Sequence, residues 1–226
     1  YYGIPHPMVS SGQLKSIILE GHKAGFQWAV HSNGDRDIDA LLDAYADALE
    51  QFPREDHRHR IEHCSIVGRD TRILERIKHL GVIPVFHEYT YEHGDKYTDY
   101  GEERIAMMHA YRSALDLGIQ PAGHSDWPVS AADPMIRIQS MVTRKSSQGV
   151  VYGPQQKVTP EEALYVWTMG NARAIFEEQE RGSIQVGKLA DLVILSNDPT
   201  RVPADSIKDI KVEKTILGGK IVYEID

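Results

Sequence analysis

The chain has 226 residues, of which 41% are hydrophobic and 26% charged, a composition typical of an ordinary folded domain. Its formal net charge of -8 argues against nucleic acid or an anionic membrane as the main partner and favours a neutral or cationic small-molecule substrate. The chain contains one cysteine, Cys64, which excludes an intrachain disulfide and a thiolate metal cluster, so a metal would need nitrogen and oxygen ligands.

The sequence carries no signal for a membrane or for export. Its apolar runs stay far below the roughly 20 residues that cross a bilayer, and no signal peptide opens it, so we expect a cytoplasmic protein. Residues 1–7 have the composition of a loop, and the first residue is Tyr1 rather than methionine. We therefore expect the sequence to be a piece of a longer protein.

From residue 10 to about residue 126 one pattern repeats: an apolar-periodic helix, a short strand and a polar turn. The predicted helix caps are Ser10 or Ser11, Asp35 and Asp70. The predicted strands cover residues 26–30, 58–62, 82–86 and 119–125. Between the last two strands we expect an aromatic loop over residues 87–102 and one helix over residues 104–117. Four strands with helices between them would make half of an eight-unit (β/α) barrel.

The C-terminal part of the chain changes from helix to strand. Residues 159–162, Thr-Pro-Glu-Glu, predict a helix start with a capping box and proline at the first position. After Gly182 an apolar strand is expected over residues 190–195, and a hairpin turns at Gly218-Gly219. The change from a helical to a strand-like sequence pattern predicts a domain boundary near residues 177–183.

Three ligand-type residues stand at the C-terminal ends of predicted strands: His31, His63 and Asp126. In a (β/α) barrel those ends carry the functional groups. Imidazole and carboxylate suit zinc and related divalent ions, and a carboxylate at the metal can also move protons. With 11 histidines in the chain, a single histidine is more often an ordinary hydrogen-bonded residue, and Asp126 is also compatible with a simple turn. The shared placement of the three favours a metal site.

Residues 31–35 (His-Ser-Asn-Gly-Asp), 60–63 (Arg-Ile-Glu-His) and 124–129 (His-Ser-Asp-Trp-Pro-Val) resemble signatures on strands five, six and eight of the amidohydrolase superfamily. The similarity is to its amidohydrolase family 3 branch, which includes N-substituted formamide deformylase-like hydrolases. Residues 159–164, 171–173 and 182–193 are similar to the closing helices of that family and to the strand that returns to its small β-sandwich.

The resemblance implies an α/β fold, namely the C-terminal half of a TIM (β/α)8 barrel over residues 1–180 and part of a β-sandwich over residues 181–226. It implies a divalent metal cofactor, with zinc expected and one or two ions in the full-length protein. His31, His63 and Asp126 would be the ligands and Asp126 the general base. The implied reaction is hydrolysis of an amide-type C–N bond of a small molecule through a metal-bound hydroxide. The family's strand-one His-x-His pair and strand-four ligand have no counterpart in this sequence.

Three further residues are candidates for substrate binding: His87, His124 and Tyr91. Tyr91 belongs to the aromatic loop, which is equally compatible with a lid, a substrate wall or a surface that packs on a neighbouring subunit. His124 precedes Asp126 by two residues and should point to the same side of its strand, where it would contact substrate or hold Asp126. A core histidine is the alternative interpretation.

Two other functions stay open beside the amide hydrolase. A half-barrel exposes strand edges, so the chain could be a catalytically incomplete structural or assembly module whose partner is the missing N-terminal half or a second copy. The same metal chemistry would also suit a deaminase acting on a heterocycle.

Overall fold

The computed structural model describes residues 10–225, and the predicted N-terminal loop, residues 1–7, lies outside the described residues. The chain divides into two compact units. The first comprises residues Tyr1–His87 and Asp95–His124, and the second comprises Glu88–Gly94 and Ser125–Asp226. Within the described part, none of the helices combines the length and the apolar character that crossing a membrane requires.

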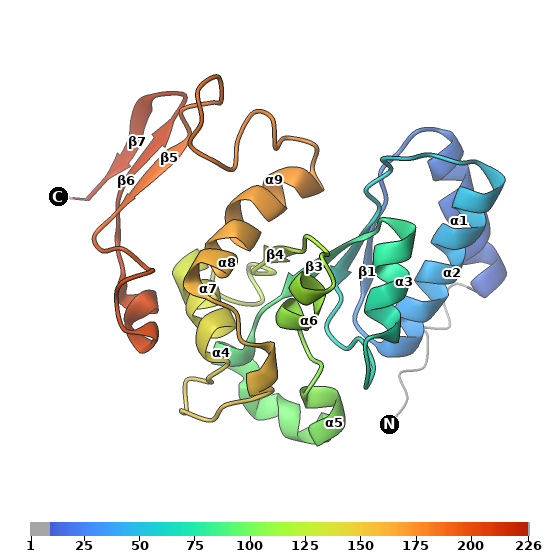
Figure 1. Ribbon diagram of the computed structural model, residues 1–226, viewed down its shortest axis with the longest axis horizontal. Coiled ribbons are helices and arrows are strands. Elements are labelled where there is room, and N and C mark those ends of the chain that lie inside the picture. The colour runs from blue at the N-terminus through green and yellow to red at the C-terminus, as the bar shows by residue number, and fades with distance from the viewer. Residues whose placement is uncertain (1–9, 226) are drawn as a thin grey trace. The chain divides into compact units, whose positions relative to one another are not determined.

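The first unit is built on a four-stranded parallel sheet in the order β1-β2-β3-β4 (Figure 1). Its strands are β1 (Ala29–Ser32), β2 (Arg60–His63), β3 (Ile83–His87) and β4 (Ala122–His124). Spatial order follows chain order, with helices between successive strands, which confirms the predicted repeat of β/α units. β1 begins three residues later than predicted and runs through His31 rather than stopping before it.

The register of the sheet brings the strand ends level. Ser32 pairs with His63, His63 with Phe86, and His87 with His124. Because all four strands run the same way, their carboxyl ends meet at one edge of the sheet. Each strand except β1 ends on a histidine, and in β1 the histidine is the next-to-last residue.

Helix α1 (Ser11–Lys23) precedes the sheet, α2 (Asp35–Gln51) connects β1 to β2, and α3 (Arg72–Leu80) connects β2 to β3. The starts of these three helices agree with the sequence in part. α1 begins with the predicted cap, since Ser10 and Gln13 form a capping box. α2 is capped by Gly34 rather than Asp35, and α3 by Thr71 rather than Asp70. The predicted cap lies one residue too late for α2 and one residue too early for α3, an error of ordinary size for helix ends.

The predicted aromatic loop and the helix after it are wrong in detail. Residues 88–105 are largely helical, with α4 (Thr90–His93), a 3₁₀ helix η1 (Gly94–Tyr100) and α5 (Glu102–Ile105). The helix expected over residues 104–117 is broken, and its second part is α6 (Tyr111–Asp116). The break lies at His109, whose φ is +47° and whose Nδ1 lies 3.2 Å from the hydroxyl of buried Tyr97. Burial of these two side chains outweighs the helical pattern.

The second unit contains helices and a small antiparallel sheet. Its longest helix is α7 (Pro134–Thr143), followed by η2 (Pro154–Gln156), α8 (Pro160–Tyr165), the π-helical η3 (Val166–Gly170) and α9 (Asn171–Ala174). The sheet, in the order β5-β6-β7, consists of β5 (Leu192–Leu195), β6 (Val212–Leu217) and β7 (Lys220–Glu224), and η4 (Ala204–Asp209) lies between β5 and β6. The capping box at Thr159 and the hairpin at Gly218-Gly219 confirm their predictions.

A buried ion pair organises the second unit around α7. Arg144 Nη1 donates to Glu88 Oε2 at 2.8 Å, and both side chains are fully buried. Glu88 Oε1 also accepts the hydroxyl of Ser140 and the backbone N–H of Thr90. Arg137 donates to the Glu88 carbonyl and pairs with Glu92. These contacts fix residues 88–92 against α7, so the start of the predicted loop is a packed segment.

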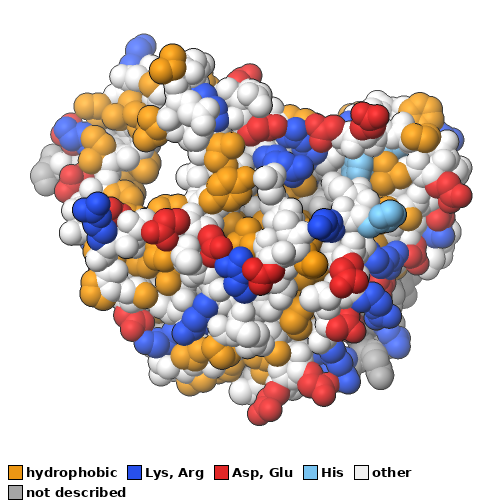
Figure 2. Space-filling model, viewed as in Figure 1, with side chains coloured by type: hydrophobic (Ala, Val, Ile, Leu, Met, Phe, Trp, Pro, Cys, Tyr) orange, Lys and Arg blue, Asp and Glu red, His pale blue; other side chains and the backbone are white. Residues whose placement is uncertain are grey.

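The β5–β7 sheet leaves much of its apolar surface in contact with solvent. Six of its hydrophobic side chains are between 42% and 59% exposed: Val193, Ile194, Leu217, Ile221, Val222 and Tyr223. Figure 2 shows hydrophobic side chains on the surface over these strands. Consecutive residues of a strand point to opposite faces, so these six side chains are divided between the two faces of the sheet.

Candidate functional site

Four histidines gather at the carboxyl edge of the parallel sheet, one from each strand. The ring centroids of His31 and His63 are 4.3 Å apart, and those of His63 and His124 are 4.7 Å apart. His87 lies 5.6 Å from His63 and stacks on His124 at 4.9 Å. His63 and His87 are buried. The level strand ends account for this convergence, because they place residues from four separate parts of the sequence on one edge.

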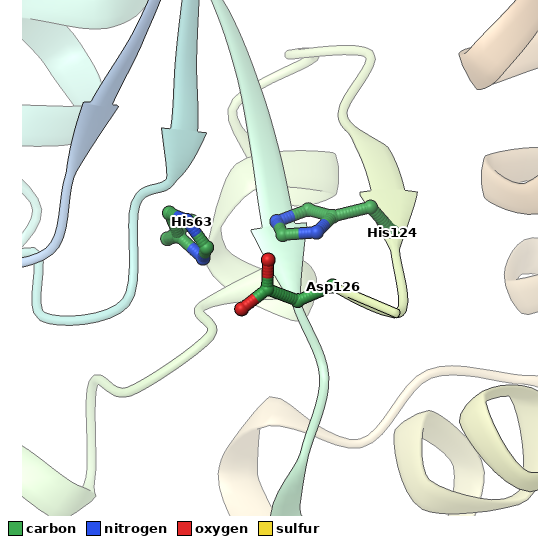
Figure 3. A group of neighbouring side chains, drawn as sticks. All are labelled: His63, His124 and Asp126. Atoms are coloured by element: carbon green, nitrogen blue, oxygen red, sulfur yellow. The ribbon is translucent and has the colours of Figure 1, made fainter. Parts of the chain in front are cut away.

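Three side chains of this region form a group with the donor atoms of a metal site. Ligand atoms of His63, His124 and Asp126 all lie within 4.8 Å of one another, and Figure 3 shows the three side chains facing one another. Asp126 follows the end of β4 by two residues. Ligand atoms about 2.1 Å from one ion are at most about 4.2 Å apart, so a side-chain adjustment of less than about 1 Å would let the group hold one divalent cation.

The backbone at two of these residues is strained. The φ angle is +71° at His63, +45° at the following Cys64, and +57° at Asp126. Most residues other than glycine avoid this left-handed region at a cost of roughly 1–2 kcal/mol each, while asparagine and aspartate adopt it more readily. A turn follows Asp126, in which its carbonyl accepts the N–H of Val129 at 2.8 Å. Strain of this kind collects at functional sites, where side-chain direction matters more than local stability.

Two consecutive hydrogen bonds link His31 to Asn33 and Asn33 to Ser65. The hydroxyl of Ser65 donates to Asn33 Oδ1 at 2.6 Å, and Asn33 Nδ2 lies 3.2 Å from His31 Nε2. His31 therefore lies beside His63, as predicted, while the group of ligand atoms within 4.8 Å contains His124 instead. The metal-binding role of His31 stays a prediction.

The other predicted residues divide between the two units. His87 and His124 lie in the histidine group, within the first unit. Tyr91 lies in the second unit on α4, and its backbone N–H donates to Ser140 on α7. The side chain of Trp127, which follows Asp126, is 70% exposed. The substrate-binding roles of His87, His124 and Tyr91 stay predictions.

Comparison with known proteins identifies the relatives of this arrangement. The model of the Amidohydrolase family, Amidohydro_3, matches residues 2–223. The chain belongs to that family. The match covers nearly all of the sequence, which confirms the resemblance seen in the strand-end motifs.

Among curated proteins, YtcJ of Bacillus subtilis is 30% identical over 217 residues, which are 93% of this chain and 40% of YtcJ. N-substituted formamide deformylase of Arthrobacter pascens is 28% identical over 218 residues, 95% of this chain and 40% of that enzyme. An uncharacterized metal-dependent hydrolase from Pyrococcus furiosus has a similar structure, with a TM-score of 0.70, 30% identity, and coverage of 86% of this chain and 38% of its own. The chain thus spans about 40% of the length of these curated relatives.

Proposed function

We propose that this chain is the C-terminal portion of a metal-dependent hydrolase that cleaves an amide-type C–N bond in a small molecule. The observation that carries the proposal is the convergence of His63, His124 and Asp126 at the carboxyl edge of a parallel sheet. Family membership supports it, as does the similarity to N-substituted formamide deformylase.

The donor set of the site fits a divalent cation of the zinc type, since it offers neutral imidazole nitrogen and carboxylate oxygen. Such an ion, when bound, would act as a Lewis acid and lower the pKa of the water that it binds toward about 7. Following the family resemblance, His31 and His63 would hold the ion and Asp126 would have two roles. Its carboxylate would accept the proton of the attacking water and then deliver that proton to the leaving nitrogen.

We also propose that β1–β4 are strands five to eight of a (β/α)8 barrel and that residues 181–226 are part of a β-sandwich. The parallel order β1-β2-β3-β4 and the antiparallel β5-β6-β7 sheet support this assignment. The extent of the matches supports it as well, because the chain aligns with roughly two fifths of its longer relatives.

The test combines metal analysis with product analysis. We expect the full-length protein that contains this chain to bind Zn²⁺ and, when loaded, to release formate and an amine from an N-alkyl formamide. Asp126→Asn should abolish the release, with Asp116→Asn, a change at an exposed aspartate of α6, as the matched control. Full activity of the full-length Asp126→Asn variant, or absence of metal binding by the full-length protein, would refute the hydrolase. Ammonia released from a heterocyclic amine would favour the deaminase instead.

A further inference from the structure

The direction of the Asp126 carboxylate depends on a segment that belongs to no helix or strand. This connecting segment, residues 125–133, leads from β4 to α7 through turns and irregular backbone. Within it the carbonyl of Asp126 accepts the N–H of Val129, and φ at Asp126 is +57°. We propose that Glu92 is a positioning residue for Asp126, because it fixes the connecting segment on α7 and so holds the carboxylate toward the cation. The inference rests on the proposed metal-dependent function.

Glu92 and Arg137 together hold both backbone polar groups of Ala131, five residues after Asp126. Glu92 Oε1 accepts the N–H of Ala131 at 3.0 Å, and Arg137 Nη2 donates to the Ala131 carbonyl at 3.3 Å. The same Nη2 pairs with Glu92 Oε2, which closes a ring of hydrogen bonds. The hydroxyl of buried Ser130 adds a hydrogen bond to the Glu92 side chain. The backbone of the connecting segment is thus fixed from two sides.

The two side chains that hold Ala131 belong to packed elements of the second unit. α4, which carries Glu92, lies against α7, which carries Arg137 (Figure 1). Arg137 is fully buried, and its Nη1 donates to the carbonyl of Glu88 at 2.7 Å. The backbone N–H of Tyr91, beside Glu92, donates to α7 as described above. Because both elements are held in this way, Glu92 can fix the connecting segment rather than move with it.

The hydrogen bonds of Glu92 are charge-assisted. Partial burial opposes ionisation of its carboxyl group, but hydrogen bonds from Arg137, Ala131 and Ser130 outweigh burial and lower the pKa of Glu92. Hydrogen bonds to a charged group are roughly twice as strong as those between neutral groups. The Glu92 carboxylate therefore holds the Ala131 N–H more firmly than a neutral side chain would. Its removal would also leave the Arg137 guanidinium buried without its counter-charge.

The test follows the surroundings of the cation, which a purely structural role would leave unchanged. The full-length protein that contains this chain is loaded with Co²⁺ for visible absorption, and its Zn²⁺ affinity is measured by calorimetry. We expect Glu92→Ala to shift the Co²⁺ bands and to weaken Zn²⁺ binding by about 10- to 100-fold, as loss of a group that supports a metal ligand does. Glu92→Gln, which keeps an oxygen for Ala131 but no charge, should shift the bands by less.

The matched control is Glu177→Ala. It removes another glutamate of the second unit that pairs with an arginine, Arg181, at 2.9 Å. We expect this variant to keep the wild-type Co²⁺ bands and Zn²⁺ affinity. Melting temperatures of the ion-free variants measure the loss of stability separately.

The outcomes distinguish this inference from the proposed function. If the full-length wild type binds neither ion, both are overturned. If it binds them but Glu92→Ala keeps the wild-type bands, or loses less than about ten-fold in Zn²⁺ affinity, only the positioning role is overturned, whatever the melting temperature. Equal changes in Glu92→Ala and Glu177→Ala would overturn it as well. Where Glu92→Ala fails to fold, Glu92→Gln decides, and wild-type bands in that variant would reject the positioning role.

Discussion

The buried ring of His59 donates a hydrogen bond to the buried ring of His22, with 2.9 Å between His59 Nε2 and His22 Nδ1. The direction is fixed by the neighbouring groups. His59 Nδ1 accepts the backbone N–H of Trp28, so the proton of the neutral ring must be on Nε2. His22 then donates from its own Nε2 to the carbonyl of Phe52, 2.7 Å away. This pattern of hydrogen bonds assigns one tautomer to each ring.

A third buried histidine extends this chain of hydrogen bonds. His57 Nδ1 accepts the backbone N–H of His59, and His57 Nε2 donates to the carbonyl of Leu80. Burial lowers the pKa of His59 to about 3 and also lowers the pKa of His57, with smaller contributions in the same direction from Arg54 and the other histidines. The stacked Tyr45 covers the other side of His59.

This group predicts acid sensitivity. An unfolded histidine binds a proton below about pH 6.5, whereas folded His57 and His59 resist it, so the unfolding free energy should fall as pH drops below 6.5. Each resisting histidine contributes a slope of about 1.4 kcal/mol per pH unit. Urea unfolding between pH 7 and pH 4.5 measures it. His59→Gln should reduce the slope by about one proton, and His79→Gln should leave it unchanged; equal slopes in all three proteins would contradict the prediction.

The buried pair of Glu88 and Arg144 predicts a large effect on stability. Glu88→Gln would leave the Arg144 guanidinium buried without its counter-charge, which should lower the unfolding free energy by about 3–5 kcal/mol. Thermal and urea unfolding measure the change. The control is Asp205→Asn, which breaks a surface pair with Lys145 and should cost less than about 1 kcal/mol. Similar losses in the two variants would show that burial of the pair has no special weight.

Cys64 should be chemically inert in the folded chain. The side chain is fully buried, and burial raises the pKa of its thiol, so little thiolate is accessible at neutral pH. A colorimetric thiol reagent should report no rapid reaction at pH 8 and one equivalent per chain after addition of 6 M urea. Rapid reaction without urea would mean that the segment after β2 opens in solution.

Cation binding should raise the thermal stability of the chain. A ligand that binds only the folded state stabilises it by about 2.7 kcal/mol at 100 times its dissociation constant. Zn²⁺ should therefore raise the melting temperature, and a chelator should reverse the shift. Asp126→Asn keeps the shape of the side chain and tolerates positive φ, so it should abolish the shift with little effect on the ion-free protein. A full shift in Asp126→Asn would remove Asp126 from the ligand set.

The features predictable from sequence are those that depend on neighbours in the chain. Ser10 with Gln13, Thr159 with Glu162, and Gly218-Gly219 form their caps and turn as expected, because the signals lie within four residues of the structures they specify. α7 was within reach of the same reasoning, since Asp133 caps it and Pro134 starts it. The helical segment from residue 88 to 100 was not, because it depends on contacts with residues 40 to 60 positions away, such as Glu88 with Arg144.

The candidate site follows the same division. The rule that strand ends carry function placed His31 and His63 on neighbouring strands, and the structure brings their rings together. The sequence predicts that His124 lies on the side of Asp126, but nothing local predicts that its ring approaches His63. Its contact with His63 depends on the order and register of strands that are separated by more than 60 residues. The hydrogen bond from Asn33 to His31 depends likewise on Ser65, which is 32 residues away.

The left-handed backbone at His63 and Asp126 sets stability against function at these two positions. Glycine would adopt the same φ angles at lower cost and remove the ligand atom, and asparagine would replace the imidazole or the carboxylate with a neutral amide. In a library of variants sorted only for resistance to proteolysis, both positions should drift toward those residues. Sorted for ion binding, the same library should keep histidine and aspartate. Comparing the two selections would reveal which residues favour ion binding at a cost in the stability of the folded chain.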